Sequence, residues 1–230
     1  MLIQGLQKLT LLDFPGKVAC TVFTGGCNFR CPFCHNASLV LNPRQNPVIS
    51  QEEIFGFLKK RQGLLDGVCV SGGEPLLQKD IADFLRRVKE LDYAVKLDTN
   101  GSFPRELKEL VRAGLVDYVA MDIKSSPEHY GRLAGIENFD MAPIRESADF
   151  LLQGDLPYEF RTTVVRGLHE KADFPAIGRW LRGARRYYLQ QFVDSPDLIG
   201  QGCQSFNEEE MEEFRQILLK DIPAAELRGQ

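Results

Sequence analysis

The sequence lacks the long apolar runs that a membrane-spanning segment requires. No hydrophobic stretch reaches the length of a membrane-crossing helix, and residues 1–8 do not show a charged segment followed by an apolar one. We therefore expect no membrane partner and no secretion signal. The formal net charge is only −4, so composition gives no general reason to expect nucleic-acid binding. The 230 residues suffice for one sizeable core, and one domain is the default expectation.

Cysteine is scarce outside one short loop. The chain has six cysteines, and three of them, Cys27, Cys31 and Cys34, follow one another at spacings of four and three residues. There is no second C-x-x-C pair and no further cysteine-rich insert. Clustered cysteines in a chain without a secretion signal favour a metal site in a reducing compartment over disulfides. We therefore expect a cytoplasmic protein with a metal centre in this loop.

The ligand chemistry of the loop favours iron and sulfur over zinc. A structural zinc site needs four nitrogen or sulfur ligands, and His35 is an awkward fourth because it directly follows Cys34. Three unrelated buried thiols are also conceivable, but a loop rich in Gly, Pro and Asn is not core patterning. A cubane cluster usually takes four thiolates, so three cysteines leave one iron open to a substrate or cofactor. The loop therefore predicts a catalytic 4Fe-4S cluster held by these three cysteines.

The hydrophobic pattern alternates between strands and helices. Strands are expected at 18–24, 67–71, 93–98, 118–123, 158–165 and 186–193, and helices at 50–62, 79–91, 104–113, 139–153, 174–181 and 208–219. Such alternation predicts an α/β fold with a parallel sheet. We expect a single domain over residues 1–230, with an N-terminal extension at 1–17, a core at 18–193 and a C-terminal loop and helix at 194–230. The pattern does not separate an open sheet from an incomplete barrel.

Polar residues stand where three of the predicted strands end, and Arg161 interrupts the apolar pattern of a fourth predicted strand. The carboxyl ends of parallel strands meet at one edge of a sheet, so these residues are candidates for one site. A glycine pair at the second strand predicts close approach of a ligand to backbone N–H groups, although a tight turn explains it equally well. Asp, Thr and Asn are also common turn and cap residues. The candidates are Gly72, Gly73, Glu74, Asp98, Thr99, Asn100, Asp122, Lys124 and Arg161.

The cysteine loop resembles a known family. Residues 24–36, TGGCNFRCPFCHN, resemble the cluster motif of the radical S-adenosylmethionine (SAM) superfamily, and more narrowly the glycyl-radical-enzyme activases. The resemblance is greatest to activating proteins of anaerobic (class III) ribonucleoside-triphosphate reductase, which residues 11–18, LLDFPGKV, also resemble. It covers nearly the whole chain and implies an incomplete (β/α)6 barrel. It also implies an oxidoreductase that takes an electron from flavodoxin or ferredoxin, cleaves SAM reductively and forms a glycyl radical on a partner enzyme.

The same resemblance implies roles for the strand-end residues. Gly72, Gly73 and Glu74 would hold the methionine amino group of SAM. Asp98, Thr99 and Asp122 would face its carboxylate and could hold a monovalent cation, because hard oxygens suit such ions. The remaining SAM contacts would come from Asn100, from Lys124 near the ribose, from Arg161, and from Phe33 against the adenine. The sequence has Val193 about where the pyruvate formate-lyase activase carries a histidine, which weakens assignment to that enzyme.

Three alternatives stay open at this point. The chain could activate another glycyl radical enzyme of the pyruvate formate-lyase type. It could be a radical SAM enzyme for a small molecule, similar to 7-carboxy-7-deazaguanine synthase, although the string Cys-Pro-Phe-Cys-His-Asn favours an activase. It could be a non-catalytic iron–sulfur carrier, against which the Gly-Gly-Glu-Pro stretch argues because a carrier needs no SAM pocket. His129 and His169 lack an evident metal partner, so we expect them at the surface.

Overall fold

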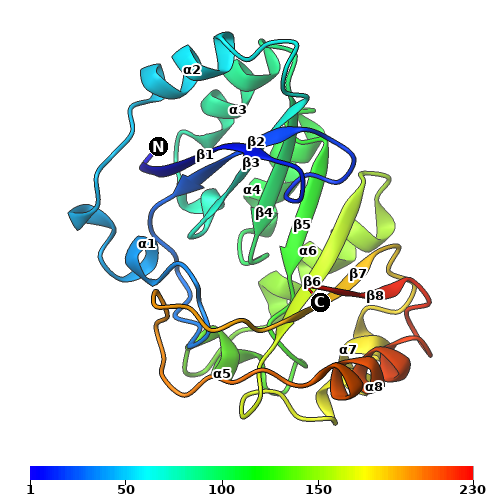
Figure 1. Cartoon of the computed structure of the whole chain (residues 1–230). Helices are drawn as coiled ribbons and strands as arrows, with labels where there is room; N and C mark the ends of the chain where they lie inside the picture. The colour runs from blue at the N-terminus through cyan, green and yellow to red at the C-terminus, as the bar shows by residue number, and fades with distance from the viewer. Residues whose placement is uncertain (230) are drawn as a thin grey trace. The chain divides into compact units, whose positions relative to one another are not determined.

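The computed structural model describes residues 1–229, and its strands and helices alternate as in Figure 1. The strands are β1 (Ile3–Thr10), β2 (Ala19–Thr24), β3 (Gly67–Gly72), β4 (Ala94–Thr99), β5 (Tyr118–Asp122), β6 (Tyr158–Val164), β7 (Tyr187–Gln191) and β8 (Ala225–Arg228). The helices are α1 (Ala37–Leu41), α2 (Gln51–Lys59), α3 (Ile81–Lys89), α4 (Pro104–Arg112), α5 (Tyr130–Ala134), α6 (Ala142–Gln153), α7 (Asp173–Trp180) and α8 (Glu208–Leu218), with short 3-10 turns at Pro43–Gln45 and Pro75–Leu77.

The chain divides into two compact units, which are described separately. The first unit comprises Met1–Asn28, Ser38–Thr99 and Phe103–Ala120, and the second comprises Phe29–Ala37, Asn100–Ser102 and Met121–Gln230, of which Gln230 lies outside the described residues. Strand β5 begins in the first unit and ends in the second. The hydrogen-bonded strand order follows the sequence from β1 to β8.

In the first unit, β1 runs antiparallel to β2, and β2, β3 and β4 pair in parallel. Side chains on these strands alternate between two faces. One face is apolar and fully buried, with Val68 and Val70 on β3 beside Val95 and Leu97 on β4. The opposite face carries polar side chains as well as Cys69, because the β3–β4 register pairs Cys69 with Lys96.

In the second unit, β6, β7 and β8 pair in parallel, and α7 packs on α8. The helix contact is aromatic, since the Phe174 and Phe214 rings stack with their centroids 4.1 Å apart. Helix α8 begins with a capping box, in which Asn207 and Glu210 satisfy each other's backbone N–H groups. Because the capping box satisfies the first backbone N–H groups of the helix, α8 begins where the sequence predicts it.

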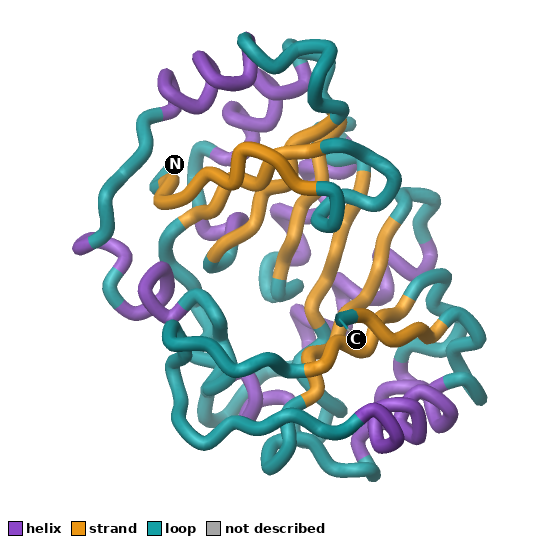
Figure 2. Tube along the Cα trace, viewed as in Figure 1, coloured by secondary structure: helices purple, strands orange, loops and turns teal. Residues whose placement is uncertain are grey.

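The predicted fold class is confirmed, and all six predicted strands and six predicted helices are present within a few residues of their expected ends. Two strands were missed, as the orange segments of Figure 2 show. Strand β1 lies in the predicted N-terminal extension, where most of its central residues are at least partly exposed, so no clear alternation marks it. Strand β8 has only four residues, which is too short for a periodic signal.

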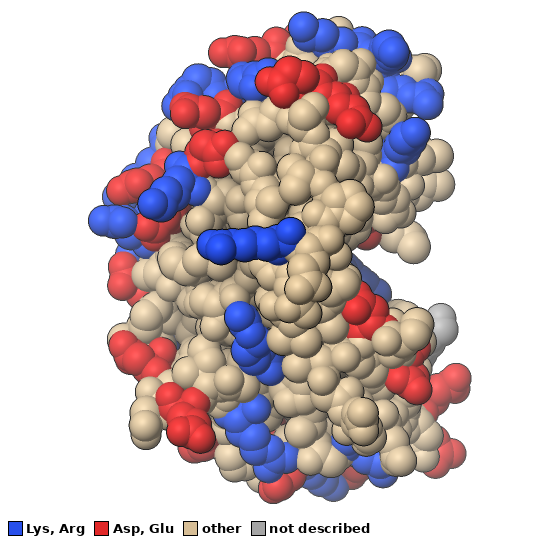
Figure 3. Space-filling view, turned by 90° about the vertical axis from the view of Figure 1, so that its left-hand side faces the viewer, with Lys and Arg blue, Asp and Glu red and all other residues tan. Residues whose placement is uncertain are grey.

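The surface shows no single-sign field on the face drawn in Figure 3, where basic and acidic side chains are interspersed. None of the helices formed by residues 1–229 has both the length and the apolar character needed to cross a membrane.

Candidate active site

The cysteine loop begins in the first unit at a turn that glycine makes possible. Gly26 has φ +88°, a left-handed conformation that residues with a Cβ rarely adopt. Its N–H donates to Leu39 O at 2.8 Å, and the Gly25 N–H donates to Leu2 O at 2.9 Å. The first thiol of the loop, Cys27, is partly exposed. The turn therefore fixes where the backbone leaves β2 and delivers Cys27.

The glycine pair after β3 packs directly against this turn. The Gly73 N–H donates to Thr24 O and the Glu74 N–H donates to Gly26 O, both at 2.8 Å. A Cβ on Gly73 would lie 2.0 Å from Gly26 O, and one on Gly72 would lie 2.4 Å from Thr24 N. The expectation that the glycine pair exposes N–H groups to a ligand is therefore wrong for Gly73, and the Glu74 N–H is engaged in the same way. Their N–H groups join the Gly-Gly-Glu loop to the cysteine loop.

The Glu74 side chain is fully buried and held in one position. Its Oε1 accepts hydrogen bonds from the Leu76 N–H at 3.1 Å and from Thr99 Oγ1 at 2.9 Å. Thr99 is the last residue of β4, so this contact ties the ends of two strands together. A buried carboxylate that is held in this way is suited to meet a cationic ligand group.

Asp98 also has fixed partners, and they come from β3 and β4. Its Oδ1 pairs with the ammonium of Lys96, which is 1% exposed, and its Oδ2 accepts from Ser71 Oγ at 3.0 Å. The Cys69 thiol lies 3.7 Å from Oδ1. The polar face of these strands thus carries a compensated acid, with Asp98 itself 14% exposed.

In the second unit, the rest of the cysteine loop is fastened on both sides. The Arg30 N–H donates to Ala134 O at the end of α5, at 2.8 Å. On the other side, Pro32 O accepts from the Gly200 N–H at 2.7 Å, and His35 Nε2 contacts Val193 O at 2.7 Å. These contacts place Cys31, which is buried, and Cys34 on an anchored backbone.

Burial raises the pKa of the Cys34 thiol, although a backbone hydrogen bond from Asn36 and the charge of Lys124 act in the opposite direction. Iron–sulfur clusters are held by thiolates, so binding a cluster releases the thiol proton. The donor type of the loop fits such a cluster, and within residues 1–229 none of the six cysteines forms a disulfide.

Residues at the end of β5 and within β6 form a charged network in the second unit. Asp122, at the end of β5, accepts from Lys124 Nζ at 3.1 Å and from Arg161 Nε at 3.0 Å. Burial acts to raise the pKa of Asp122, but the two cations outweigh it and lower the pKa to about 2. Burial likewise disfavours the Lys124 ammonium, but Asp122 raises its pKa. With two cations for one carboxylate, this network carries a net positive charge that suits a ligand carboxylate.

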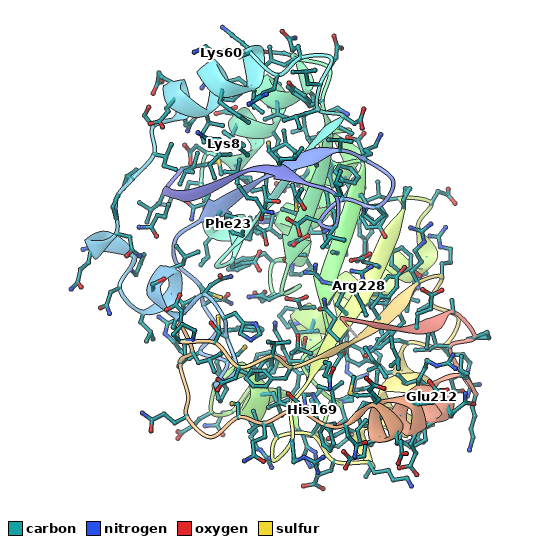
Figure 4. The ribbon with its side chains drawn as sticks, in the orientation of Figure 1. Lys8, Phe23, Lys60, His169, Glu212 and Arg228 are labelled. Carbon is teal, nitrogen blue, oxygen red and sulfur yellow. The ribbon has the colours of Figure 1, made fainter. Side chains whose placement is uncertain are left out.

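A second carboxylate, Glu159, also lies beside Arg161. The Arg161 guanidinium lies 4.0 Å from Glu159, a carboxylate that is 1% exposed and that takes two hydrogen bonds from Arg228, at 2.9 and 3.0 Å. Arg228 belongs to β8 and is labelled in Figure 4. The missed C-terminal strand therefore supplies a counter-charge that keeps Glu159 paired beside Arg161.

Phe33 lies near both Lys124 and His169 in the second unit. The Lys124 ammonium is 6.0 Å from the centroid of the Phe33 ring, and the His169 ring centroid is 6.4 Å from it. His169, labelled in Figure 4, is 3% exposed, so the expectation that it lies at the surface is wrong. Its Nε2 contacts Lys124 O at 2.8 Å, and its Nδ1 accepts the Val165 N–H at 3.1 Å. Burial lowers the pKa of His169, which keeps the ring neutral.

Asn100 has a local role in the second unit. Its Oδ1 accepts from the Ser102 N–H at 2.9 Å and from Ser102 Oγ at 2.6 Å, which closes a turn after β4. His129 is partly exposed and contacts Asp173 at 2.8 Å.

The predicted site residues fall into two sets. The first unit holds Cys27, Gly72, Gly73, Glu74, Asp98 and Thr99, and the second unit holds Cys31, Phe33, Cys34, Asn100, Asp122, Lys124 and Arg161. Within residues 1–229, no three His, Cys, Asp or Glu side chains are grouped so that they could hold a metal ion. The structure therefore links residues within each set, and it leaves the complete thiolate set a prediction.

Sequence reasoning missed three residues that support the predicted ones. Lys96 and Glu159 are charged residues inside otherwise buried strands, and that contrast was the signal that could have found them. His169 follows β6 in a loop and has no comparable signal, because its partners are backbone atoms.

Comparisons with known proteins agree on the family. The sequence profile of the Radical SAM superfamily matches residues 21–172. A protein of Methanocaldococcus jannaschii, described as a proposed glycyl-radical enzyme activating enzyme, is 33% identical over 196 residues, which cover 83% of this chain and 80% of that protein. A proposed GTP 3′,8-cyclase of Thermococcus kodakarensis is 31% identical over 64% of this chain but only 47% of its own length.

Solved structures show the same fold. A domain of pyruvate-formate lyase-activating enzyme from Bacteroides vulgatus matches with a TM-score of 0.58 and 21% identity, over 71% of this chain and 99% of that domain. SuiB of Streptococcus suis, bound to its precursor peptide, matches with a TM-score of 0.71 and 12% identity, over 91% of this chain and 48% of that protein.

Proposed function

This chain belongs to the radical SAM superfamily, and we propose that it is an activase that generates a glycyl radical on a partner enzyme. The superfamily uses a 4Fe-4S cluster and SAM. The observation that carries the proposal is the cysteine loop at residues 24–36, which lies in the matched region of a chain that is 33% identical to a proposed activating enzyme over most of its length.

Cys27, Cys31 and Cys34 would hold the cluster, and the strand-end residues would hold SAM. When bound, the two cofactors supply a reductive cleavage of SAM that yields methionine and a 5′-deoxyadenosyl radical. In the first unit, the buried Glu74 carboxylate supplies an acceptor for the methionine amino group, and Thr99 orients it through the 2.9 Å hydrogen bond.

In the second unit, Lys124 and Arg161 supply the positive charge that a SAM carboxylate needs. Asp122 holds both cations in place, and each of them is only 15% exposed. Phe33 supplies a buried aromatic surface for the adenine, and His169 fixes the backbone of Lys124 beside it. We propose that both units work as one radical SAM domain over residues 1–230, because each unit carries part of the predicted cysteine set.

The partner we propose is an anaerobic (class III) ribonucleoside-triphosphate reductase. The support is the resemblance of residues 11–18 and 24–36 to activators of that enzyme. A flavodoxin or ferredoxin-type protein would donate the electron. Six cysteines without a disulfide in residues 1–229 suit a reducing compartment, so we propose that the chain works in the cytoplasm.

The test combines cluster reconstitution with electron paramagnetic resonance. The reconstituted, reduced protein is mixed anaerobically with SAM and a purified class III reductase subunit, and 5′-deoxyadenosine is assayed beside the spectrum. We expect a glycyl doublet that disappears in Cys31→Ala and persists in Cys20→Ala, because Cys20 is a buried β2 residue outside the loop.

Other outcomes separate the alternatives. Deoxyadenosine without a doublet would keep radical SAM chemistry but reject this partner, and it would favour another glycyl radical enzyme or a small molecule. The 31% identity to a proposed GTP 3′,8-cyclase is the observation behind the small-molecule candidate, and GTP can be added as the competing substrate. If a fully loaded, reducible cluster gives neither the doublet nor deoxyadenosine, the activase is rejected and an electron carrier remains.

A further inference from the structure

Lys96 is a lysine inside a buried strand. Its side chain is 1% exposed, and it is among the largest fully buried side chains of the described residues. Burying an ammonium group is costly unless a negative partner lies against it. That partner is Asp98, two residues further along β4 and therefore on the same face of the strand. The Cys69 sulfur lies 3.9 Å from the ammonium and adds no charge of its own when protonated.

The resemblance places Asp98 at the carboxylate of SAM, where it would share a monovalent cation with Thr99 and Asp122. A bound cation needs oxygen ligands whose negative charge is not already compensated. Asp98 has an ammonium on Oδ1 and the Ser71 hydroxyl on Oδ2. Thr99 Oγ1 donates a hydrogen bond to Glu74, and its hydroxyl carries no negative charge that a cation could compensate.

The other proposed cation ligand is compensated too. In the second unit, Asp122 contacts both Lys124 and Arg161, at 3.1 and 2.9 Å. Each of the two acids is therefore already paired with a side-chain cation within its own unit. The charge pattern of this chain does not fit an additional monovalent cation.

We propose that Lys96 is the resident counter-cation of Asp98 and takes the place of a monovalent cation at the SAM site. Lys96 is a positioning residue in this role: its ammonium holds the Asp98 carboxylate in one orientation and compensates its charge. SAM binding should consequently be independent of K⁺ and Na⁺. The inference rests on the proposed function for the location of SAM, while the pairing of Lys96 with Asp98 does not.

The first experiment follows thermal unfolding of the cluster-free protein in KCl, NaCl and tetramethylammonium chloride at equal ionic strength. Wild-type unfolding midpoints should agree across the three salts to within about 1 °C. Lys96→Ala removes the ammonium and leaves space, so its midpoint should fall by several degrees in tetramethylammonium, on the order expected for breaking a buried pair. We expect K⁺ or Na⁺ to recover part of that loss, because each is small enough to fill the vacated position.

Lys89→Ala is the matched control. Lys89 pairs with Asp117 at 2.8 Å, but its side chain is 31% exposed, so water can compensate Asp117 in the variant. Its midpoint should not respond to the identity of the cation. If Lys96→Ala does not fold, Lys96→Met, which fills the same volume and leaves no room for a cation, measures the loss of the charge alone, and the wild-type comparison among the three salts decides the inference by itself.

The second experiment measures SAM affinity of the reconstituted protein by anaerobic equilibrium dialysis in the same salts. Wild-type affinity should change less than twofold, whereas the Lys96 variant should bind SAM at least fivefold more tightly in KCl than in tetramethylammonium chloride.

Two results would overturn the inference. One is specific stabilisation of the wild-type protein by K⁺ or Na⁺, in unfolding or in SAM affinity. The other is a folded Lys96→Ala protein that no small cation rescues, because Lys96 would then hold Asp98 without standing in for an ion. A wild-type protein that neither binds nor cleaves SAM would defeat the proposed function instead, and the unfolding data would still decide the role of Lys96.

Discussion

The two halves of the predicted SAM site are built by different means. In the first unit, glycine backbone packs on backbone, with Gly73 so close to Gly26 that no side chain fits between them. In the second unit, long charged side chains meet around Asp122. The first arrangement fixes shape and tolerates no added atom, whereas the second fixes charge and tolerates adjustment of flexible side chains. Site residues in the two units therefore need not respond equally to substitution, even where they occupy similar places near the ends of strands.

Gly73→Ala should lower the free energy of unfolding the most, because its added methyl group disrupts the packing of one backbone segment on another. The added Cβ would meet Gly26 O at 2.0 Å, and moving that carbonyl breaks its hydrogen bond with the Glu74 N–H. We expect a loss of about 3 kcal/mol or more in the free energy of unfolding, from overpacking against a backbone atom. Urea denaturation of the cluster-free protein measures it, and iron content after reconstitution should fall in parallel.

Gly56→Ala is the control for that prediction. Gly56 lies in α2, and a Cβ there would meet nothing within 4 Å. This variant should be more stable than the wild type by about 0.5–1 kcal/mol, since alanine favours a helix interior over glycine. A Gly73→Ala protein with wild-type stability would show that the two loops are not locked together.

Asp122→Asn tests the charged half and should have an intermediate effect. The substitution keeps the shape of the side chain but leaves Lys124 and Arg161 without their shared negative charge. We expect a loss of about 2 kcal/mol, below the value for a fully buried pair because Asp122 is 34% exposed and water screens part of the charge. Asp83→Asn, which breaks an exposed pair with Arg86, should cost less than about 0.5 kcal/mol.

The stability loss in Asp122→Asn should also depend on pH. The Asp122 pKa is lowered to about 2 in the folded protein, so its contribution is complete above the ordinary carboxyl pKa of about 4. It is lost as the pH falls from about 4 towards 2. The stability difference between the wild type and Asp122→Asn should therefore shrink across that window, and a constant difference down to pH 2 would contradict the charge assignment.

The fold was largely predictable because most of its elements carry a strong local signal. Helix α3 repeats buried residues at helical spacing, and β3 is a short apolar run between turns. Strand β1 was missed because it is half-exposed and is defined by its partner β2. Antiparallel pairing with a later strand is a tertiary property that local periodicity does not encode.

The candidate site was predictable in its residues but not in its contacts. The residues of the Gly-Gly-Glu loop could be named, but the use of their N–H groups on the cysteine loop depends on how two distant turns pack. The pairing of Asp98 with Lys96 follows from strand alternation, and attention to a charged residue in a buried strand would have predicted it. The support of Arg161 by Glu159 and Arg228 depends on a strand more than sixty residues away from Glu159, which no local pattern reveals.

His169→Gln should give the smallest effect, and it tests how the charged half is fixed to its backbone. The neutral ring accepts the Val165 N–H and contacts Lys124 O, and burial lowers its pKa. The unfolded chain therefore takes up a proton first, at its ordinary pKa of about 6.5, so the wild-type protein loses stability as the pH falls below that value. Between pH 7 and pH 5.5 the wild type should lose about 1 kcal/mol more than His169→Gln, as measured by urea denaturation of the cluster-free proteins. Equal losses in the two proteins would mean that His169 can bind a proton in the folded state. The contact between His169 and the Lys124 carbonyl would then not depend on a neutral ring that accepts the Val165 N–H.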